Sequence, residues 1–202
     1  MHSYDTNFFI KKVFTNTELF NKVLNELLDS NSKLIILRSV LGELLKHLWM
    51  INSSLSQFKS DIRKTSFDQA SNSNKMKKFS EIYDNIFNYI KENFKGGDYS
   101  IIDKVIQRIS QFNIYLNECE NIYPTEEAEY EKIRNSQEYK ELAKKIEIDD
   151  IPHLVLLELY GKQIKQKIEF VSCDWEDISK EKSKDKIKLQ FEFIEPIDCN
   201  EF

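Results

Sequence analysis

Two kinds of hydrophobic pattern alternate over the first part of the chain. Residues 34–37, Leu-Ile-Ile-Leu, form a continuous apolar run, which is typical of a strand buried on both faces. Apolar residues at helical spacing precede and follow this run. They predict one helix whose start is capped by Thr15 and Glu18, and a second helix over 40–51. With a short strand that ends at Asp5, the order strand, helix, strand, helix indicates a parallel α/β sheet.

Residues 52–146 have a different character. The segment 52–74 is rich in Ser, Asn and charged residues and contains no clear buried stretch. Residues 75–94 and 100–118 each place large apolar side chains on one side of a helix, and a glycine turn joins them, which predicts a helical hairpin. A strongly charged helical region follows over 124–145. We therefore expect a mainly helical insertion here.

The last part of the chain returns to the α/β pattern. A helix that starts at Asp150 can accommodate Pro152 in its first turn, where a missing N–H costs nothing. Residues 170–171 predict a strand that is followed at once by polar and acidic residues. Apolar and polar residues then alternate over 187–193, which predicts a half-buried edge strand that ends before Pro196.

Composition narrows the class of protein. The chain has 202 residues, 41% of them hydrophobic, which suits one domain with an insertion. The net charge of −5 weighs against a non-enzymatic nucleic-acid binder, but not against a nuclease whose metal ions offset local acidity. Three cysteines without CxxC spacing predict a reducing compartment and no zinc site. Without an apolar run of membrane-spanning length or a signal peptide, we expect a cytoplasmic protein with no membrane partner.

Carboxylates at four places define the candidate chemistry. Asp5 and Asp174 follow predicted strands, Asp150 opens a helix, and Glu43 lies within an apolar helix; Asp149, Glu176 and Asp177 are close by. Strand ends and helix starts of a parallel sheet share one edge, so these acids are expected to converge. Hard cations such as Mg²⁺ or Mn²⁺ prefer carboxylate oxygens and can activate water for phosphodiester hydrolysis.

Each residue also has a simpler interpretation. Asp150 can serve as a helix cap, and Asp5 as an ordinary turn residue. Glu43 can pair with a lysine, although carboxylates are rarely buried unpaired. His47 and His153 belong to a residue type that more often packs in a core or lies on the surface than binds a metal. Taken together, the four principal acids are better explained by convergence on one site.

The acids stand in motifs that resemble those of the PIN-domain nucleases. That family has a strand ending in Asp-Thr-Asn, a helical Glu in Val-Leu-x-Glu-Leu, an acid opening an Asp-Ala-Leu-His-Leu helix, and a Thr-x-Asp-x-Asp segment after a strand. The corresponding segments here are Asp5-Thr6-Asn7, Val40-Leu41-Gly42-Glu43-Leu44, Asp150-Ile151-Pro152-His153-Leu154 and Ser172-Cys173-Asp174-Trp175-Glu176. Ser172 stands where the family more often has Thr.

The resemblance implies a PIN-like three-layer fold, with a central mainly parallel sheet flanked by helices. It makes 1–202 a single domain, with a core from 1–51 and 147–202 and a helical insertion over 52–146. It also implies a Mg²⁺- or Mn²⁺-dependent endoribonuclease that cleaves single-stranded RNA, and a role as the toxin of a toxin–antitoxin pair. The implied catalytic and metal-binding residues are Asp5, Glu43, Asp150 and Asp174, supported by Asn7, Asp149, Ser172, Glu176 and Asp177.

Two other classes of function stay open. One is a catalytically inactive PIN-like or other α/β scaffold whose helical insertion binds another protein, such as an antitoxin or a second copy of the chain. The other is a phosphatase or DNA nuclease that uses the same ions. Positions of the four carboxylates discriminate between these classes, because a scaffold has no need to bring them together.

Overall fold

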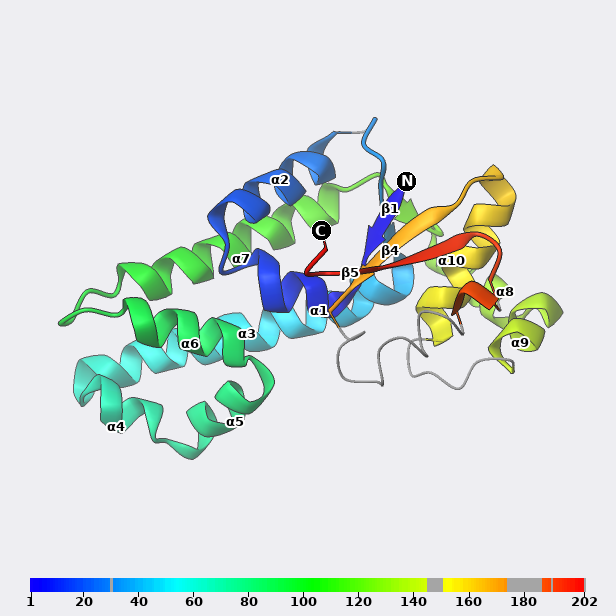
Figure 1. Cartoon of the computed structure of the whole chain (residues 1–202). Helices are drawn as coiled ribbons and strands as arrows, with labels where there is room; N and C mark the ends of the chain where they lie inside the picture. Colours follow the sequence, from blue (N-terminus) through cyan, green and yellow to red (C-terminus); the bar gives the residue numbers. More distant parts are fainter. Residues whose placement is uncertain (30, 145–150, 174–186, 190, 202) are drawn as a thin grey trace. The chain divides into compact units, whose positions relative to one another are not determined.

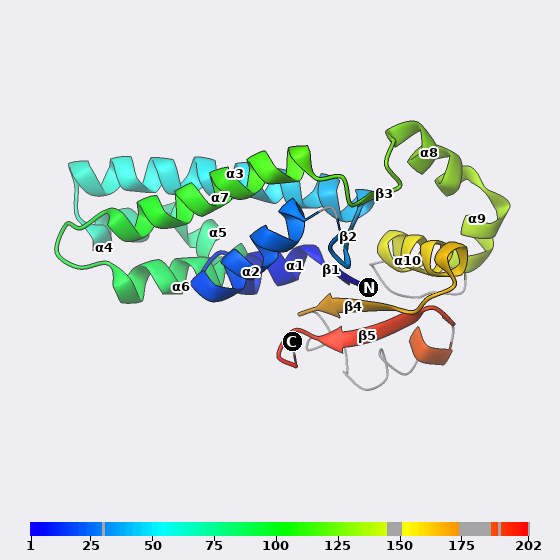
Figure 2. The same cartoon turned by 90° about the horizontal axis from the view of Figure 1, so that it is seen from above.

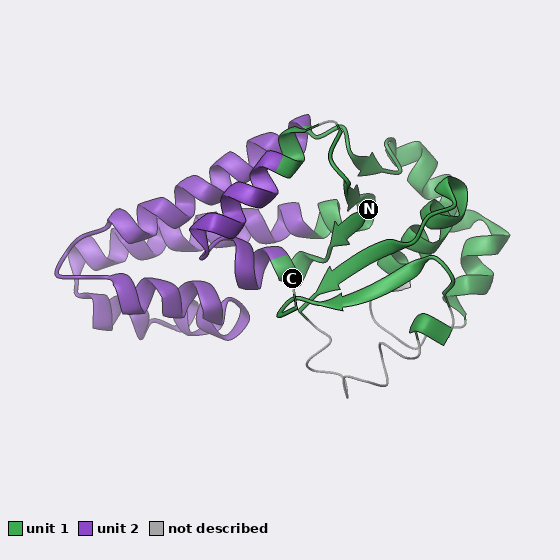
Figure 3. Cartoon of the chain, turned by 45° about the horizontal axis from the view of Figure 1, so that its top comes forward, with its two compact units in different colours: residues 1–8, 26–43, 119–202 green, residues 9–25, 44–118 purple. Residues whose placement is uncertain are grey.

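The computed structural model describes residues 1–29, 31–144, 151–173, 187–189 and 191–201 (Figure 1). They form two compact units (Figure 3). We call residues 1–8, 26–43 and 119–202 the sheet unit, and residues 9–25 and 44–118 the helical unit. These boundaries differ from those of the predicted core and insertion: the helical unit also takes in residues 9–25 and 44–51, and the sheet unit takes in residues 119–144 of the predicted insertion.

A five-stranded, all-parallel sheet forms the centre of the sheet unit, in the order β3-β2-β1-β4-β5. The predicted mainly parallel sheet flanked by helices is therefore confirmed. The central strand β1 pairs on both sides, so that Ser3 lies between Ile35 and Phe170. The bounds are β1 His2–Tyr4, β2 Leu34–Leu37, β3 Ile122–Tyr123, β4 Ile168–Ser172 and β5 Ile194–Asp198.

The sheet unit contains several short helices, one longer helix, α10, and the first residues of α3. They are α1 Thr6–Phe8, the first residues of α3 Arg38–Lys64, α8 Glu127–Asn135, α9 Gln137–Ala143 and α10 Ile151–Ile164. Helix α10 packs on β2 and β5, and the side chains of Leu154, Val155, Leu156 and Leu157 are fully buried. Burial on nearly every side explains why this helix is apolar all round rather than amphipathic.

Two residues of α10 fix the segment that leads into β5. The buried carboxylate of Glu158 accepts hydrogen bonds from the backbone N–H groups of Glu192 (3.3 Å) and Phe193 (3.0 Å). Gly161 packs so closely against Phe193 that a Cβ at this position would overlap the Phe193 Cβ. The helix thus sets where the edge strand begins.

The alternating pattern over 187–193 was wrongly interpreted as a strand. Residues 187–189 form a helical turn, and the edge strand is β5, Ile194–Asp198, which runs beside β4 (Figure 2). Pro196 lies within β5 and does not end it. Backbone N–H groups alternate sides along a strand, and Cys199 donates to the Ser172 carbonyl of β4, so the Pro196 nitrogen lies on the outer side. An edge strand accepts this proline because no ladder hydrogen bond is lost.

The helical unit is built around an aromatic cluster. Phe9, Phe14 and Phe20 surround Phe112, with ring centroids 5.2, 5.5 and 6.4 Å away. Arg108 is buried beside them; its guanidinium donates to the Phe14 carbonyl (2.9 Å) and to the Thr17 hydroxyl. The elements are the π-helix η1 Phe9–Val13, most of α2 Thr17–Leu28, the rest of α3, α4 Phe67–Ser71, α5 Asn74–Ile82, α6 Asp84–Asn93 and α7 Ser100–Glu118.

Three helix predictions need correction. Helix α3 does not end at residue 51 but continues to Lys64, because Leu55, Phe58 and Ile62 keep a buried stripe through the Ser- and Asn-rich segment. The single helix predicted over 75–94 is interrupted at Tyr83, whose backbone (φ −123°, ψ 47°) is not helical. At the start of α2, Asn16 is the cap: its side-chain oxygen accepts from the backbone N–H groups of the second and third helical residues, at 3.0 Å each.

Candidate metal site

The C-terminal edge of the sheet brings together polar side chains from four elements, β1, β4, α3 and α10. Asp5 directly follows β1, Ser172 is the last residue of β4, and α3 begins immediately after β2. All of these strands run parallel, so their carboxyl ends lie at one edge. His153, in the first turn of α10, joins them there.

Asp5 is a buried carboxylate, and each of its two oxygens accepts a hydrogen bond. It is 2% exposed. One carboxylate oxygen accepts from the backbone N–H of Thr6 (2.6 Å) and the other from the hydroxyl of Ser172 (2.9 Å). The backbone N–H of Asp5 itself donates to the Val171 carbonyl at 2.9 Å. The side chain is thereby held at the end of β1.

Thr6 connects this carboxylate to a second one. Its hydroxyl donates to Oε2 of Glu43 at 2.8 Å, while its backbone N–H donates to Asp5. The Glu43 side chain is 46% exposed, so the pair of acids has a buried end and an end open to solvent. The motif resemblance assigned Thr6 no role of its own; the structure shows that it donates hydrogen bonds to both acids.

His153 completes the cluster. It is 7% exposed, and its Nε2 lies 3.4 Å from Oε2 of Glu43. Its Nδ1 lies 2.7 Å from the hydroxyl of Ser39, near the start of α3. The expectation that His153 is more often a packing residue did not anticipate this position. The signal in the sequence was its place in the first turn of a helix expected to open at the acidic edge.

Asp5, Glu43 and His153 together can hold a metal ion. One ligand atom from each, two carboxylate oxygens and a ring nitrogen, lies within 4.8 Å of the others. A small cation bound at about 2.1 Å separates ligands on opposite sides by about 4.2 Å, so a slight inward movement suffices. Glu43 is the side chain best able to make it, because nearly half of its surface faces solvent.

The structure brings together some of the predicted site residues. Asp5 lies close to both Glu43 and Ser172, and Asn7, half-buried, follows Thr6 within α1. The remaining predicted residues lie outside the described part of the chain; they are Asp149, Asp150, Asp174, Glu176 and Asp177. Their membership of the site stays a prediction.

Tyr4, the neighbour of Asp5, has a structural role. Its ring stacks on Phe8 with centroids 4.4 Å apart, and its hydroxyl donates to Glu26 at 3.0 Å. Burial raises the pKa of the Tyr4 phenol, and the Glu26 carboxylate raises it further. Tyr4 therefore stays neutral over the physiological range and anchors β1 to the end of α2.

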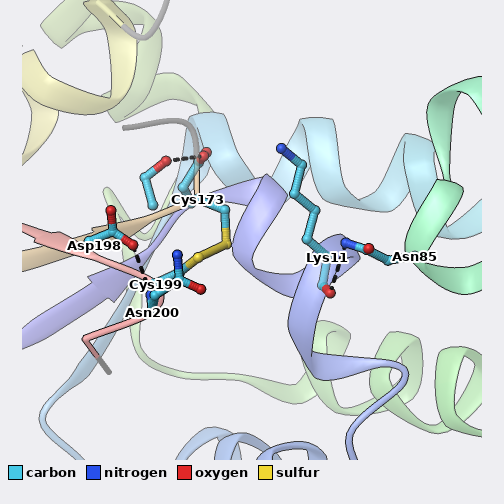
Figure 4. Close-up of a disulfide and its surroundings, with 8 residues drawn as sticks. Lys11, Asn85, Cys173, Asp198, Cys199 and Asn200 are labelled. Atoms are coloured by element: carbon cyan, nitrogen blue, oxygen red, sulfur yellow. Dashed lines mark hydrogen bonds between the residues drawn. A yellow bond between two sulfur atoms is a disulfide. The ribbon is translucent and has the colours of Figure 1, made fainter. Parts of the chain in front are cut away.

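A disulfide links Cys173 to Cys199 just beyond the ends of β4 and β5 (Figure 4). Their Cα atoms are 5.0 Å apart, and the backbone N–H of Cys199 donates to the Ser172 carbonyl at 3.0 Å. The disulfide begins one residue after Ser172, and the Ser172 hydroxyl is the group that donates to Asp5. Cys119 is a buried free thiol whose pKa burial raises. The prediction of a reducing compartment, where cysteines remain thiols, did not anticipate this disulfide.

Comparisons with protein-family models, with curated proteins and with solved structures find no match to this chain. The PIN-domain resemblance therefore remains an interpretation of the motifs. Among the described helices, none combines the length and apolar composition that a bilayer span requires.

Proposed function

We propose that this protein is a metal-dependent endoribonuclease that hydrolyses phosphodiester bonds of single-stranded RNA. The observation that carries the proposal is the meeting of Asp5, Glu43 and His153 at the C-terminal sheet edge. These residues come from separate segments of the chain, and a fold without a ligand there gains nothing by placing two carboxylates so close. RNA as the substrate class rests on the motif resemblance, as does a toxin role with an antitoxin partner.

Each residue has a stated role in this proposal. Asp5, Glu43 and His153 hold the cation, which is Mg²⁺ or Mn²⁺ on the motif resemblance, and Asp150 and Asp174 are predicted to add oxygen ligands. A bound divalent cation supplies an activated water and offsets charge that develops on the phosphate. Thr6 and Ser172 orient the two carboxylates through their hydrogen bonds. The exposed side of Glu43 is where a phosphodiester can approach.

The test is cleavage of single-stranded RNA by the purified protein. We expect cleavage with Mg²⁺ or Mn²⁺, loss of cleavage with EDTA, and recovery when the ion is restored. Asp5→Asn should remove activity, while the free energy of unfolding changes by less than about 1 kcal/mol, because relief of repulsion offsets one weakened hydrogen bond. Asp68→Asn, an exposed aspartate of α4, is the matched control and should stay fully active.

Two results would count against the proposal. Cleavage that survives thorough chelation would exclude the metal mechanism, and a large fall in melting temperature for Asp5→Asn would make Asp5 structural. Single-stranded DNA and phosphate monoesters tested in parallel separate the ribonuclease from a DNA nuclease or a phosphatase with the same ions.

We also propose, as a second function, that the helical unit associates with a second copy of the chain. A groove of about 300 Å³ lies between α3 and α7, and Trp49 and Ile114 on its walls are 72% and 56% exposed. Its lining, which lies wholly within described helices, consists of apolar, Asn and Ser side chains without a charge. In a two-fold interface the same patch of both copies meets, so charged residues near the axis would face like charges. The groove lining has no charge, although 31% of the chain is charged, and it therefore suits contact with a second copy.

A further inference from the structure

We infer that His153 is a nitrogen ligand of the bound cation, and that the site therefore selects a first-row transition ion such as Mn²⁺ over Mg²⁺. This inference rests on the metal site of the proposed function, but not on RNA being the substrate. It departs from the all-oxygen site that the four acids predicted.

The orientation of the imidazole is the first argument. Nδ1 faces the Ser39 hydroxyl at 2.7 Å, and Nε2 lies 3.4 Å from Oε2 of Glu43. A hydroxyl can accept a hydrogen bond, so Ser39 suits a ring protonated on Nδ1 with the lone pair on Nε2. Metal-binding histidines are commonly held in this way, with the far nitrogen donating to an outer partner that fixes tautomer and ring angle.

Burial is the second argument. His153 is 7% exposed, and the next four residues of α10, 154–157, are fully buried. A buried ring has little freedom to turn away, so Nε2 is presented to the site at small entropic cost. The partly exposed Glu43 can adjust around it, whereas Asp5 and His153 are fixed.

A simple ion pair between His153 and Glu43 explains less. The distance of 3.4 Å is long for a charge-assisted hydrogen bond, and Glu43 already accepts from Thr6 at 2.8 Å. A pair with a half-exposed carboxylate contributes little to stability. An ion pair also needs two groups, whereas a third ligand atom, from the buried Asp5, lies within 4.8 Å of both. The convergence of three groups is what a cation requires.

The donor set then decides between ions. Mg²⁺ binds oxygen ligands and keeps much of its water, whereas imidazole suits the transition ions. Mn²⁺ accepts both carboxylate oxygen and imidazole nitrogen, so a site with two carboxylates and one histidine favours it. Replacing the nitrogen by a carboxylate oxygen should reduce that preference.

The experiment uses the full-length protein with MnCl₂ and MgCl₂. Titration of the free Mn²⁺ electron paramagnetic resonance signal, with Mg²⁺ as competitor, gives the affinity ratio, and pulsed spectra of bound Mn²⁺ report directly coordinated nitrogen. We expect nitrogen coupling in the wild type, its loss in His153→Gln, and an affinity ratio for Mn²⁺ over Mg²⁺ that falls about tenfold or more in His153→Asp. The other histidines provide matched controls: His2→Gln and His47→Gln should keep the coupling.

Each alternative result has a defined meaning. Bound Mn²⁺ without nitrogen coupling in the wild type overturns the inference, whether or not the variants fold. An unchanged affinity ratio in a folded His153→Asp protein overturns it too. Failure to bind Mn²⁺ overturns the inference, and failure to bind either Mn²⁺ or Mg²⁺ also removes the metal basis of the proposed function. Nitrogen-coordinated Mn²⁺ in a protein that cleaves no RNA leaves the inference standing and refutes the ribonuclease.

Discussion

At the scale of single residues, hydroxyl groups hold the acidic cluster in place. Thr6 donates to Glu43, Ser172 to Asp5, and Ser39 contacts His153. Each hydroxyl touches one of the three groups that can hold a cation, and each comes from the end of a strand or the start of a helix. Two like charges brought close together repel, so such partners are needed to keep the carboxylates oriented when no cation lies between them.

Ser172 offers a direct test of this support. Ser172→Ala removes the donor to the buried Asp5 oxygen and should weaken Mn²⁺ binding by about ten- to a hundredfold, the usual effect of losing an outer partner. Ser172→Thr keeps the hydroxyl and should restore binding. The measurement is the Mn²⁺ dissociation constant from the same spectroscopic titration.

Ser3 supplies the control for that substitution. It is also a fully buried strand serine, but its hydroxyl has no hydrogen-bond partner within the described residues. Ser3→Ala should leave Mn²⁺ affinity unchanged and cost no stability, because no buried bond is broken. Equal losses of affinity in Ser3→Ala and Ser172→Ala would show a general packing effect instead of a role for the Ser172 hydrogen bond.

At the scale of elements, hydrophobic spacing along the chain predicted those helices and strands that depend on local sequence alone. The buried run of β2 and the stripes of α2 and α7 follow from hydrophobic spacing alone. The same kind of pattern predicted a strand before Asp5 and a helix around Glu43, which are β1 and the start of α3. Their contact with His153 could not be predicted, because it depends on α10 meeting the start of α3, which is tertiary packing. The alternating pattern over 187–193 led to a wrong strand prediction, because the backbone N–H groups of Glu192 and Phe193 donate to the carboxylate of Glu158. Glu158 is distant in the sequence, so local pattern could not predict this contact.

Two helical glycines test how closely α10 approaches β5. A Cβ at Gly161 would overlap Phe193 and lie 3.0 Å from the Gln166 carbonyl, so Gly161→Ala should destabilise the fold by about 1–3 kcal/mol. Gly42 in α3 has open space where a Cβ would lie, so Gly42→Ala should stabilise by about 0.5–1 kcal/mol through helix propensity. Chemical denaturation of both variants measures the difference. A Gly161→Ala protein as stable as Gly42→Ala would mean that the helix and strand do not pack this closely.

At the scale of the whole molecule, the proposed catalysis and the proposed self-association belong to different units. The candidate metal site belongs wholly to the sheet unit, and the uncharged groove belongs wholly to the helical unit. Helix α3 is shared, since Glu43 is the last of its residues in the sheet unit and Trp49 lies further along in the helical unit. Substitutions at the candidate metal site and at the groove therefore fall in different units.

Trp49 is the residue on which the proposed self-association depends. A large exposed aromatic side chain beside an uncharged groove is costly to leave in water and is typical of the energetic centre of an interface. Trp49→Ala should weaken dimerisation by about 2 kcal/mol or more, a roughly thirtyfold rise in the dimer dissociation constant. Sedimentation equilibrium over a range of protein concentrations measures that constant.

The control is Ile82, a residue of α5 that is also exposed (55%) but does not line the groove. Ile82→Ala should leave the dimer dissociation constant unchanged, because loss of a scattered surface apolar group costs the interface nothing. The metal site contains no groove residue, so Mn²⁺ affinity should be equal in wild type and Trp49→Ala. A wild-type protein that stays monomeric at every concentration would rule out a second copy as the occupant of the groove, and equal weakening by both substitutions would place the interface elsewhere.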